Sequence, residues 1–293
     1  MNKKALAKSY LKSKLYKLAA VAISDRAFIR WQYQRETGRT LDLAHPATFN
    51  EKLQWLKLNC RNDIYRRCAD KYEVREYVTE VLGAHLLNEL YAVYDRPGEI
   101  DLNHLPDACV LKLTHGSGQN VIITDKSKVD PRELRWLLRY YFGANHYFVG
   151  REWAYRNITP RIVCEKYLDD GGASPKDYKI FCFDGEPRII QVDFDRFSDH
   201  KRNLYDLDWR LLPCEYLYRI KAEEVRRPED LDTMLEYARR LAHGFPFVRV
   251  DLYCLAHRIV FGEMAFYPEK GTGEFRPESY DLLLGSYLKL PGK

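Results

Sequence analysis

The chain contains the stretch Phe247-Val-Arg-Val-Asp-Leu-Tyr-Cys254, followed three residues later by Arg258-Ile-Val-Phe-Gly-Glu-Met-Ala265. Both runs are short and rich in apolar and β-branched residues, a composition typical of strands. The break between them, residues 255–257, is short enough for a hairpin. We therefore expect two paired antiparallel strands near the end of the chain.

Two acidic residues in this hairpin suggest a metal site. If the turn is centred near His257, Asp251 and Glu263 lie opposite each other on one face, whereas a register slipped by one residue separates them. Directly opposed carboxylates, with Cβ atoms about 5 Å apart, destabilise a sheet. Such a pair is tolerated when a cation lies between them, most simply Mg²⁺ held by oxygen ligands. The hairpin alone leaves both alternatives open.

Composition limits the class of protein. The chain has 293 residues, enough for two domains or one large α/β unit, and its 46% hydrophobic and 30% charged content is typical of a globular protein. The formal net charge of +5 permits an anionic ligand but does not indicate nucleic acid. The seven cysteines form no C-x-x-C pair. We therefore expect neither a disulfide framework nor a zinc site, and we predict a cytoplasmic setting.

The N-terminus is basic. Six lysines precede the first acidic residue, and no apolar run in the chain approaches 18 residues. Residues 1–22 are either an amphipathic helix in peripheral contact with an anionic membrane at its inner face, or a solvated basic helix packed through its leucines. The sequence leaves both alternatives open, and it does not indicate the oligomeric state.

The pattern of secondary structure changes along the chain. Residues 3–82 are predicted to be mostly helical, with Thr48 and Glu51 forming a capping box. Later segments alternate between strands and single helices, which indicates α+β layers rather than a regular βαβ repeat. The predicted strands are 86–94, 108–113, 121–124, 162–167, 178–183 and 188–194, and the predicted helices are 131–141, 228–242 and 279–288.

One stretch has the composition of a phosphate-binding hairpin. In residues 110–122, Lys112 precedes the turn Gly116-Ser117-Gly118, whose backbone amides can approach phosphate oxygens. It is not a Walker A motif, because the lysine precedes the glycines and no helix follows directly. An ordinary glycine hairpin explains the stretch better when it is considered alone. His115 in the turn is either an acid–base group or a packing residue.

Three further stretches carry polar groups. Residues 162–168 end a strand, where backbone groups commonly bind an adenine. Asp177 and Lys179 lie on one face of the next strand by the period-two rule, which also fits a surface ion pair. Asp193 and Asp195, followed by Arg196 and further cations, form either an anion-binding site or a solvated loop.

The order of these features resembles the ATP-grasp superfamily: a Lys-then-Gly loop, a Glu-x-x-Leu strand end, an Asp/Lys strand, then Arg-Val-Asp and Gly-Glu strands. Several motifs resemble its teichuronopeptide-biosynthesis (TupA-like) branch, found in bacterial cell-surface polysaccharide gene sets. The resemblance covers roughly residues 45 to 275. The motifs are Thr48-Phe-Asn-Glu-Lys-Leu-Gln-Trp55, Thr114-His-Gly-Ser-Gly118, Asp177-Tyr-Lys179, Cys182-Phe-Asp-Gly185 and Gly262-Glu-Met-Ala-Phe-Tyr-Pro268.

The resemblance implies an ATP-grasp fold, in which two α+β lobes sandwich ATP after a mostly helical N-terminal segment. The division expected from it is a basic amphipathic helix over 1–30, a helical segment over 31–105, and the ATP-grasp lobes over 106–293. The small lobe would cover about 106–170 and the large lobe about 171–293.

The resemblance also implies roles for individual residues. Arg75 and Lys112 would contact the phosphates, and the glycine loop His115, Gly116, Ser117 and Gly118 would act as a lid. The strand end Glu165, Lys166, Tyr167 and Leu168 would bind adenine, and Asp177 would reach the ribose. Asp251 and Glu263 would hold Mg²⁺. The catalytic groups implied are Arg196, Arg249 and Lys179, with Arg276 as a further candidate to orient a carboxylate or acyl phosphate.

Two departures from the family pattern stand out. The usual third metal ligand, an asparagine two residues after the glutamate, is Ala265 here. The usual Rossmann-like domain before the ATP site is replaced by a mostly helical segment. The first departure concerns the binding of a second metal ion, and the second concerns the binding of the acceptor substrate.

The function implied is an ATP- and Mg²⁺-dependent carboxylate–amine ligase that acts through an acyl phosphate. Its partners would be a glycan or small-molecule carboxylate, specifically a uronic acid, and an amine such as an amino acid, in surface polysaccharide synthesis. A sugar-directed transferase, either a kinase or a glycosyltransferase with Asp193-Phe-Asp195 as its metal motif, is one alternative. A non-catalytic basic module that docks membrane or polymer is another.

Overall fold

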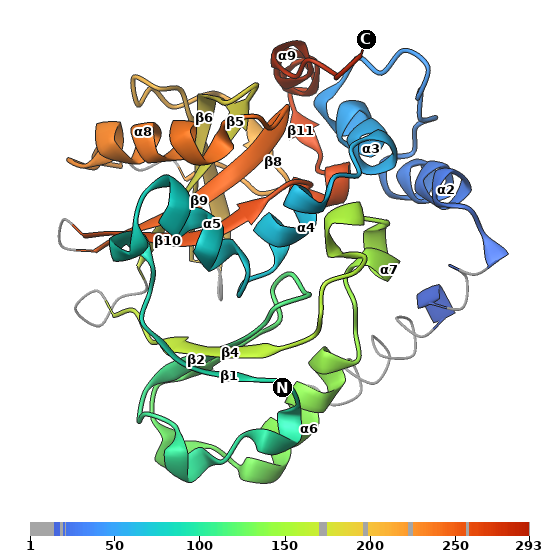
Figure 1. Cartoon of the computed structure of the whole chain (residues 1–293). Coiled ribbons are helices and arrows are strands. Elements are labelled where there is room, and N and C mark those ends of the chain that lie inside the picture. Colours follow the sequence, from blue (N-terminus) through green and yellow to red (C-terminus); the bar gives the residue numbers. More distant parts are fainter. Residues whose placement is uncertain are drawn as a thin grey trace. The chain divides into compact units, whose positions relative to one another are not determined.

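The computed structural model describes residues 15–17, 20, 22–169, 175–195, 199–221, 225–255 and 258–292 (Figure 1). Most of the predicted N-terminal helix, the hairpin residues 256–257 and the candidate Arg196 lie outside these residues. The chain divides into two compact units that are not contiguous in sequence. The first unit comprises 1–32, 61–77 and 88–168, and the second comprises 33–60, 78–87 and 169–293. The expected segment 31–105 thus contributes residues to both units.

The first unit contains a four-stranded antiparallel sheet. Its order is β1–β4–β2–β3, so β4 is a central strand paired on both sides. The strands are β1 (Leu90–Tyr94), β2 (Cys109–Leu113), β3 (Asn120–Ile123) and β4 (Ile162–Lys166).

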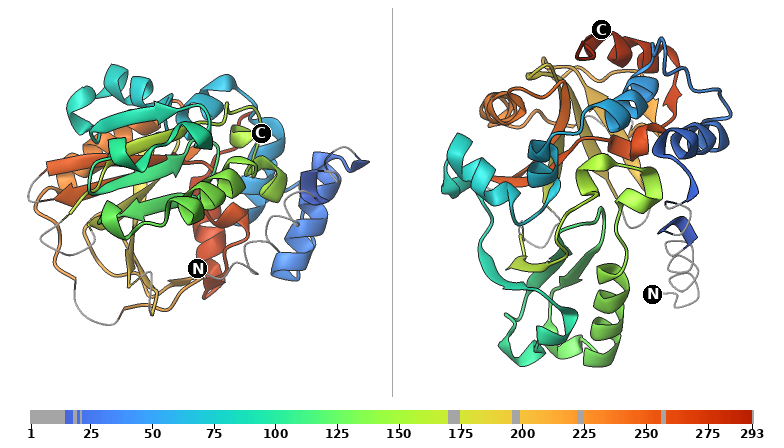
Figure 2. Two further views of the ribbon diagram at one scale, coloured as in Figure 1. Left: turned by 90° about the horizontal axis from the view of Figure 1, so that it is seen from below. Right: turned by 45° about the vertical axis from the view of Figure 1, so that its right-hand side comes forward.

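Helix α6 (Pro131–Phe142) covers one face of this sheet, as Figure 2 shows. Asp130 caps the helix by accepting from the first-turn amides, and Pro131 occupies the first turn, where it costs no hydrogen bond. Leu134 and Leu138 are buried against strand residues such as Leu111. The other helices with residues in this unit are α2 (Asp25–Thr37), α4 (Asp63–Ala69), α5 (Val74–Val81) and α7 (Tyr147–Gly150), with short 3₁₀ turns η2 (Pro97–Glu99), η3 (Leu102–His104), η4 (Lys126–Lys128) and η5 (Trp153–Tyr155).

The second unit contains a five-stranded antiparallel sheet in the order β10–β9–β5–β6–β7. Its strands are β5 (Lys176–Phe183), β6 (Glu186–Phe194), β7 (Lys201–Tyr205), β9 (Phe247–Leu255) and β10 (Arg258–Ala265). A two-stranded sheet pairs β8 (Glu215–Tyr216) with β11 (Phe275–Arg276). Helices α3 (Phe49–Asn59), α8 (Leu231–Ala242) and α9 (Ser279–Tyr287) and the 3₁₀ turns η1 (Ala84–Leu86) and η6 (Pro268–Gly271) complete the unit.

The two faces of the five-stranded sheet differ in character. Helix α8 packs on β9, β5 and β6, where Cys182 of β5 approaches the Ala238 carbonyl. The opposite face has an aromatic cluster at one end, in which Phe49 of α3 meets Phe247 at 4.9 Å between ring centroids and Phe183 at 5.7 Å. Further along these strands the same face turns polar. Because every second residue of a strand points to the same face, Phe247 of the aromatic cluster and the polar Arg249 and Asp251 lie on one face of β9.

Much of this architecture agrees with the sequence-based expectations. The α+β class is confirmed, and so is the capping box, since Thr48 accepts from the Glu51 amide and Glu51 accepts from the Thr48 amide. Within the predicted helical region 3–82, the helix is interrupted between α4 and α5. Asp70 ends α4 with extended backbone, and its carboxylate accepts from the amides of Tyr72 and Glu73 before α5 begins. Within the described residues, no helix is both long and apolar enough to cross a bilayer.

Candidate functional site

The polar half of the five-stranded sheet forms a row across its central strands. Glu263 of β10 lies opposite Asp251 of β9, Asp251 lies opposite Lys179 of β5, and Lys179 lies opposite Gln191 of β6. Residues directly opposite in antiparallel strands share a face. Four strands therefore bring these four side chains to one surface, and the expected opposition of the two acids is confirmed.

A bulge produces this register. Nearer the turn, the hairpin pairs Phe261 with Leu252, one residue out of step with the expected pattern, and the register shifts between Phe261 and Glu263. The extra residue is Gly262. A Cβ atom there would lie 2.9 Å from the Asp251 carbonyl oxygen, so the position suits glycine alone.

Two basic side chains hold the Asp251 carboxylate. Arg249 donates to both of its oxygens at 2.7 Å, and the Lys179 ammonium donates to it at 3.0 Å. Lys179 also pairs with Asp177, and Arg249 reaches Glu263 at 3.4 Å. The cation expected near the opposed carboxylates is thus supplied here by Arg249.

Burial strengthens these interactions. Asp177, Lys179, Arg249 and Asp251 are all buried, whereas the Glu263 side chain is 36% exposed. Burial alone would lower the pKa of Arg249, but the neighbouring Asp251 and Glu263 raise it above its ordinary value. Three carboxylates face two cations, so the cluster has a formal charge of −1. An added cation is therefore electrostatically acceptable at this surface.

The row extends onto β6 and β7 through residues whose role the sequence did not reveal. The Gln191 amide donates to Asp193, and the buried Arg202 donates to Asp193 at 2.6 Å and to Glu269 at 2.9 Å. Asp193 is thus engaged inside the unit, which gives no support to the Asp193-Phe-Asp195 metal motif. Alternation of Gln191 and Asp193 with apolar neighbours is the sequence signal that could have placed them on this face.

In the first unit, one buried acid holds both predicted phosphate-binding cations. Lys112 donates to Glu165 at 2.7 Å, and Arg75 donates to it at 3.2 Å. Val110 lies opposite Glu165, so Lys112, two residues along β2, shares its face. This face is the one that α6 leaves uncovered, and it also carries the 52% exposed Ile122, which lies opposite Val110. An exposed apolar side chain next to two cations suits a ligand with a planar base and an anionic group.

The glycine turn after β2 is anchored within the same unit. The Lys71 ammonium donates to the Gly116 carbonyl at 2.6 Å, and Gly118 has a left-handed backbone with φ +71°. His115 is fully buried, with its Nε2 3.1 Å from the Phe142 carbonyl. Burial lowers its pKa to about 4, so His115 is neutral near pH 7, and its buried ring packs against that of Phe142.

The strand end 165–168 is largely engaged by its own sheet. Glu165 pairs with both neighbouring strands, the Lys166 amide donates to the Glu89 carbonyl, and the Lys166 carbonyl accepts from Asn88. Tyr167 and Leu168 follow the last paired residue. They remain the predicted adenine contacts of this segment, whereas Asp177, the predicted ribose contact, belongs to the second unit.

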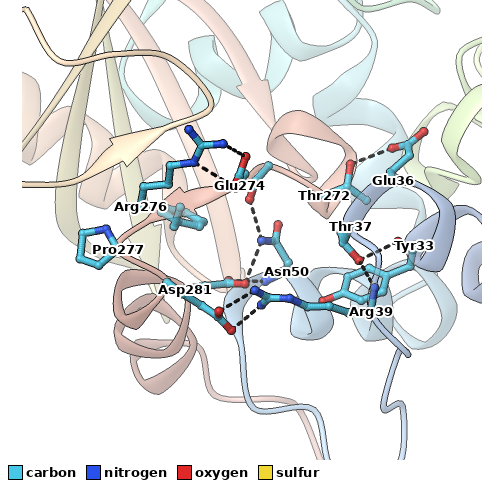
Figure 3. A pocket seen from close by; sticks show the side chains of 13 residues that line it. Tyr33, Glu36, Thr37, Arg39, Asn50, Thr272, Glu274, Arg276, Pro277 and Asp281 are labelled. Carbon is cyan, nitrogen blue, oxygen red and sulfur yellow. Dashed lines mark hydrogen bonds and ion pairs between the residues drawn. The ribbon is translucent and has the colours of Figure 1, made fainter.

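A separate pocket of about 420 Å³ lies in the second unit, lined from the end of α2, the start of α3, β11 and the start of α9 (Figure 3). Asn50 of α3 donates hydrogen bonds to the Gly273 carbonyl, which precedes β11, and to Asp281 of α9. These two bonds join the elements that line the pocket. At its rim, two hydrogen bonds join each of the pairs Arg39–Glu278 and Arg276–Glu274. Arg276 is therefore placed here and not on the five-stranded sheet.

The donor chemistry at the sheet fits Mg²⁺. Among the described residues, no three His, Cys, Asp or Glu side chains are arranged to hold a metal. Mg²⁺, however, is usually bound by one or two carboxylates together with substrate phosphates and waters. Asp251 and Glu263 supply two such oxygen donors. Ala265, opposite Arg249, adds none.

Comparison with known proteins agrees with this geometry. A family model described as TupA-like ATP-grasp matches residues 51–289, most of the chain. The protein therefore has the ATP-grasp fold, as its motifs indicated. More narrowly, the chain belongs to the TupA-like ATP-grasp family. Comparison with curated protein sequences found no match.

Several solved structures are similar at low identity. The D-alanine–D-alanine ligase from Bacillus anthracis complexed with ATP is 14% identical with a TM-score of 0.38, over 68% of this chain and 53% of that chain. The ATP-grasp ligase PsnB with a phosphomimetic precursor variant, Mg and ADP is 11% identical, with a TM-score of 0.42, over 82% and 65%. The ADP complex of PurK, an N5-carboxyaminoimidazole ribonucleotide synthetase, is 13% identical, with a TM-score of 0.43, over 74% and 50%. The chain thus spans between half and two thirds of the length of these structures.

Proposed function

We propose that the protein is an ATP- and Mg²⁺-dependent ligase that joins an amine to a carboxylate through an acyl phosphate. The observation that carries this proposal is the row of Glu263, Asp251 and Lys179 across three strands, with Arg249 bonded to both acids. Membership of the TupA-like ATP-grasp family supports it.

Each unit supplies one part of the chemistry. In the first, Lys112 and Arg75 exchange Glu165 for phosphate oxygens of ATP, and the turn anchored by Lys71 offers backbone amides. In the second, Asp251 and Glu263 would hold Mg²⁺, which would supply positive charge to offset the charge on the transferred phosphoryl group. Such transfer depends on positioning and electrostatics more than on a protein nucleophile.

Arg249 and Lys179, the cations of the second unit, bind the acids in the unliganded protein and are proposed to bind the substrate carboxylate during the reaction. If Asp251 and Glu263 held the metal, Arg249 and Lys179 would be released to pair with the substrate carboxylate. They would orient it for attack on the γ-phosphate, with ADP as the leaving group. The amine then displaces phosphate from the acyl phosphate, which forms the amide. Because the Ala265 side chain offers no oxygen and the residue opposite it is Arg249, one protein-bound metal is favoured over two.

The substrate is proposed by analogy with the family. We propose a uronic-acid carboxylate and an amino acid or similar amine in bacterial surface polysaccharide synthesis, in a cytoplasmic protein. This assignment rests on analogy with the branch.

The test is ATP turnover by the purified chain with glucuronate, with a panel of amino acids, and with both. ADP release that requires both partners is expected. ADP release with sugar alone would indicate a kinase, and no nucleotide binding would overturn the proposal. Asp251→Asn and Glu263→Gln should each abolish Mg²⁺-dependent turnover while the circular dichroism spectrum is preserved. Normal turnover by either variant would refute the metal assignment.

A further inference from the structure

Helix α6 has a solvent face of unusual composition. Leu134 and Leu138 are buried in the core, while Arg132, Arg135, Trp136 and Arg139 are all exposed. At 100° per residue Arg132, Trp136 and Arg139 fall on the side away from the two leucines, and Tyr140 borders Trp136. Arg135 lies on the flank, next to Leu138. We call Arg132, Arg135, Trp136, Arg139 and Tyr140 the basic–aromatic face.

The arginines of this face are not neutralised by the part of the chain that the structure describes. Arg132, Arg135 and Arg139 form no ion pair with any described carboxylate, although Glu133 lies on the flank of the same helix. Exposed arginines elsewhere, such as Arg226 and Arg276, do hold acidic partners. Three like charges within two helical turns repel each other, so their grouping favours an anionic partner.

The aromatic residues extend this surface. Trp136 is 41% exposed, and its ring stacks on that of Tyr140, with centroids 6.2 Å apart and planes 16° from parallel. Indole and phenol rings have an apolar body and a polar edge, which suits the boundary between lipid headgroups and acyl chains.

A groove with a mixed polar and apolar lining adjoins the same helix. Its volume is about 320 Å³, and its lining includes Ile100, Leu102, Pro131 and Leu134 beside Arg135. Asp101 also lines it, and its carboxylate accepts from the Asn103 amide. The groove adds no predominantly apolar surface, so the match to a phospholipid rests on the arginines beside the exposed Trp136 and its neighbour Tyr140.

We propose that the basic–aromatic face of α6 docks the protein on a bilayer surface that contains anionic phospholipid. The arginines contact the headgroups, and Trp136 inserts at the level of the headgroup–acyl boundary. This contact is distinct from any made by residues 1–22 and does not depend on the ligase activity.

Vesicle sedimentation of the full chain tests the electrostatic part. Binding is expected to vesicles of phosphatidylcholine with 30% phosphatidylglycerol, and little to phosphatidylcholine alone. The triple variant Arg132→Gln/Arg135→Gln/Arg139→Gln should bind about 100-fold more weakly. The matched control removes three exposed arginines of the second unit, Arg210→Gln/Arg226→Gln/Arg239→Gln, and should bind within about threefold of the unchanged protein.

Brominated lipids test the insertion. They should quench part of the tryptophan fluorescence of the bound protein, and Trp136→Phe should remove most of that quenching. Equal binding by the two triple variants, or quenching unchanged in Trp136→Phe, would overturn the proposal. So would binding of heparin or DNA that competes for the same arginines in the absence of any vesicle binding.

Discussion

Glu263 lies directly opposite Asp251 only because the chain gains one residue at Gly262. Between Gly262 and the turn, the pairing is shifted by one residue relative to the Glu263–Asp251 pair, as in Phe261 with Leu252. Without the bulge, Glu263 would point to the opposite face. The predicted metal site therefore depends on a backbone irregularity as much as on the two acids.

The first prediction concerns this bulge. Gly262→Ala should destabilise the protein by about 1–3 kcal/mol and lower Mg²⁺-dependent ATP turnover, because the new methyl group would meet the Asp251 carbonyl at 2.9 Å and the Tyr253 ring at 3.2 Å. Urea denaturation and turnover assays measure both effects. Gly98→Ala is the matched control, since a Cβ at Gly98 meets nothing within 4 Å. Equal behaviour of the two variants would contradict this account.

Sequence patterns were sufficient to predict β5, β6, β9 and β10 of the site, but not β7. Period-two alternation identifies Asp177 and Lys179 as neighbours on one face, and the order of motifs indicates the family. Local chemistry was equally sufficient at Thr48, whose capping box depends on residues three apart.

The remaining features depend on long-range contacts. The hairpin alone suggests a metal between Asp251 and Glu263, yet the neighbouring cation is Arg249, whose reach depends on the bulge. Lys112 and Arg75 are 37 residues apart, and no local pattern shows that both would bond to Glu165. Similarly, the break at Asp70 follows from capping by its own carboxylate, which overrides the helical periodicity around it.

The second prediction concerns the shared acid of the first unit. Glu165→Gln should lower the thermal midpoint of the unliganded protein and tighten ADP binding by about tenfold, because phosphate would no longer displace a carboxylate from Lys112 and Arg75. Calorimetry with ADP measures the affinity. Glu89→Gln removes an exposed acid that pairs with Lys166 and serves as the control. Weaker ADP binding by Glu165→Gln would show that Glu165 assists the nucleotide instead of competing with its phosphates.

The third prediction is a pH dependence set by His115. Its folded pKa is about 4, below the unfolded value of about 6.5, because the ring is buried. The unfolded state therefore binds the proton more readily. The stabilisation is complete above about pH 6.5 and is lost as the pH falls toward 4, by about 3 kcal/mol in all.

His115→Gln should flatten this part of the stability–pH curve, since an amide can still donate to the Phe142 carbonyl but does not titrate. Urea midpoints of both proteins between pH 7 and pH 4 give the comparison. If the two curves remain parallel, His115 is not the group responsible.

The last prediction concerns Lys57, a lysine of α3 that is only 1% exposed. Its ammonium donates to the Gln54 side chain at 2.9 Å and to the Lys270 carbonyl at 2.8 Å. Lys270 and Glu269 both have left-handed backbone, with φ of 59° and 49°, which costs energy in residues other than glycine. Lys57 therefore helps to stabilise the strained turn that brings Glu269 to within 2.9 Å of Arg202.

Lys57→Met keeps the length of the side chain but removes its donors, so it should cost about 1–3 kcal/mol in the free energy of unfolding and loosen the contact between Glu269 and Arg202. Urea denaturation measures the first effect, and faster amide hydrogen exchange at residues 269–271 reports the second. Lys289→Met replaces a lysine whose side chain is 82% exposed and should change stability by less than about 0.5 kcal/mol. Exchange at 269–271 that is unchanged in Lys57→Met would mean that the turn is held by Gln54 and the surrounding chain without Lys57.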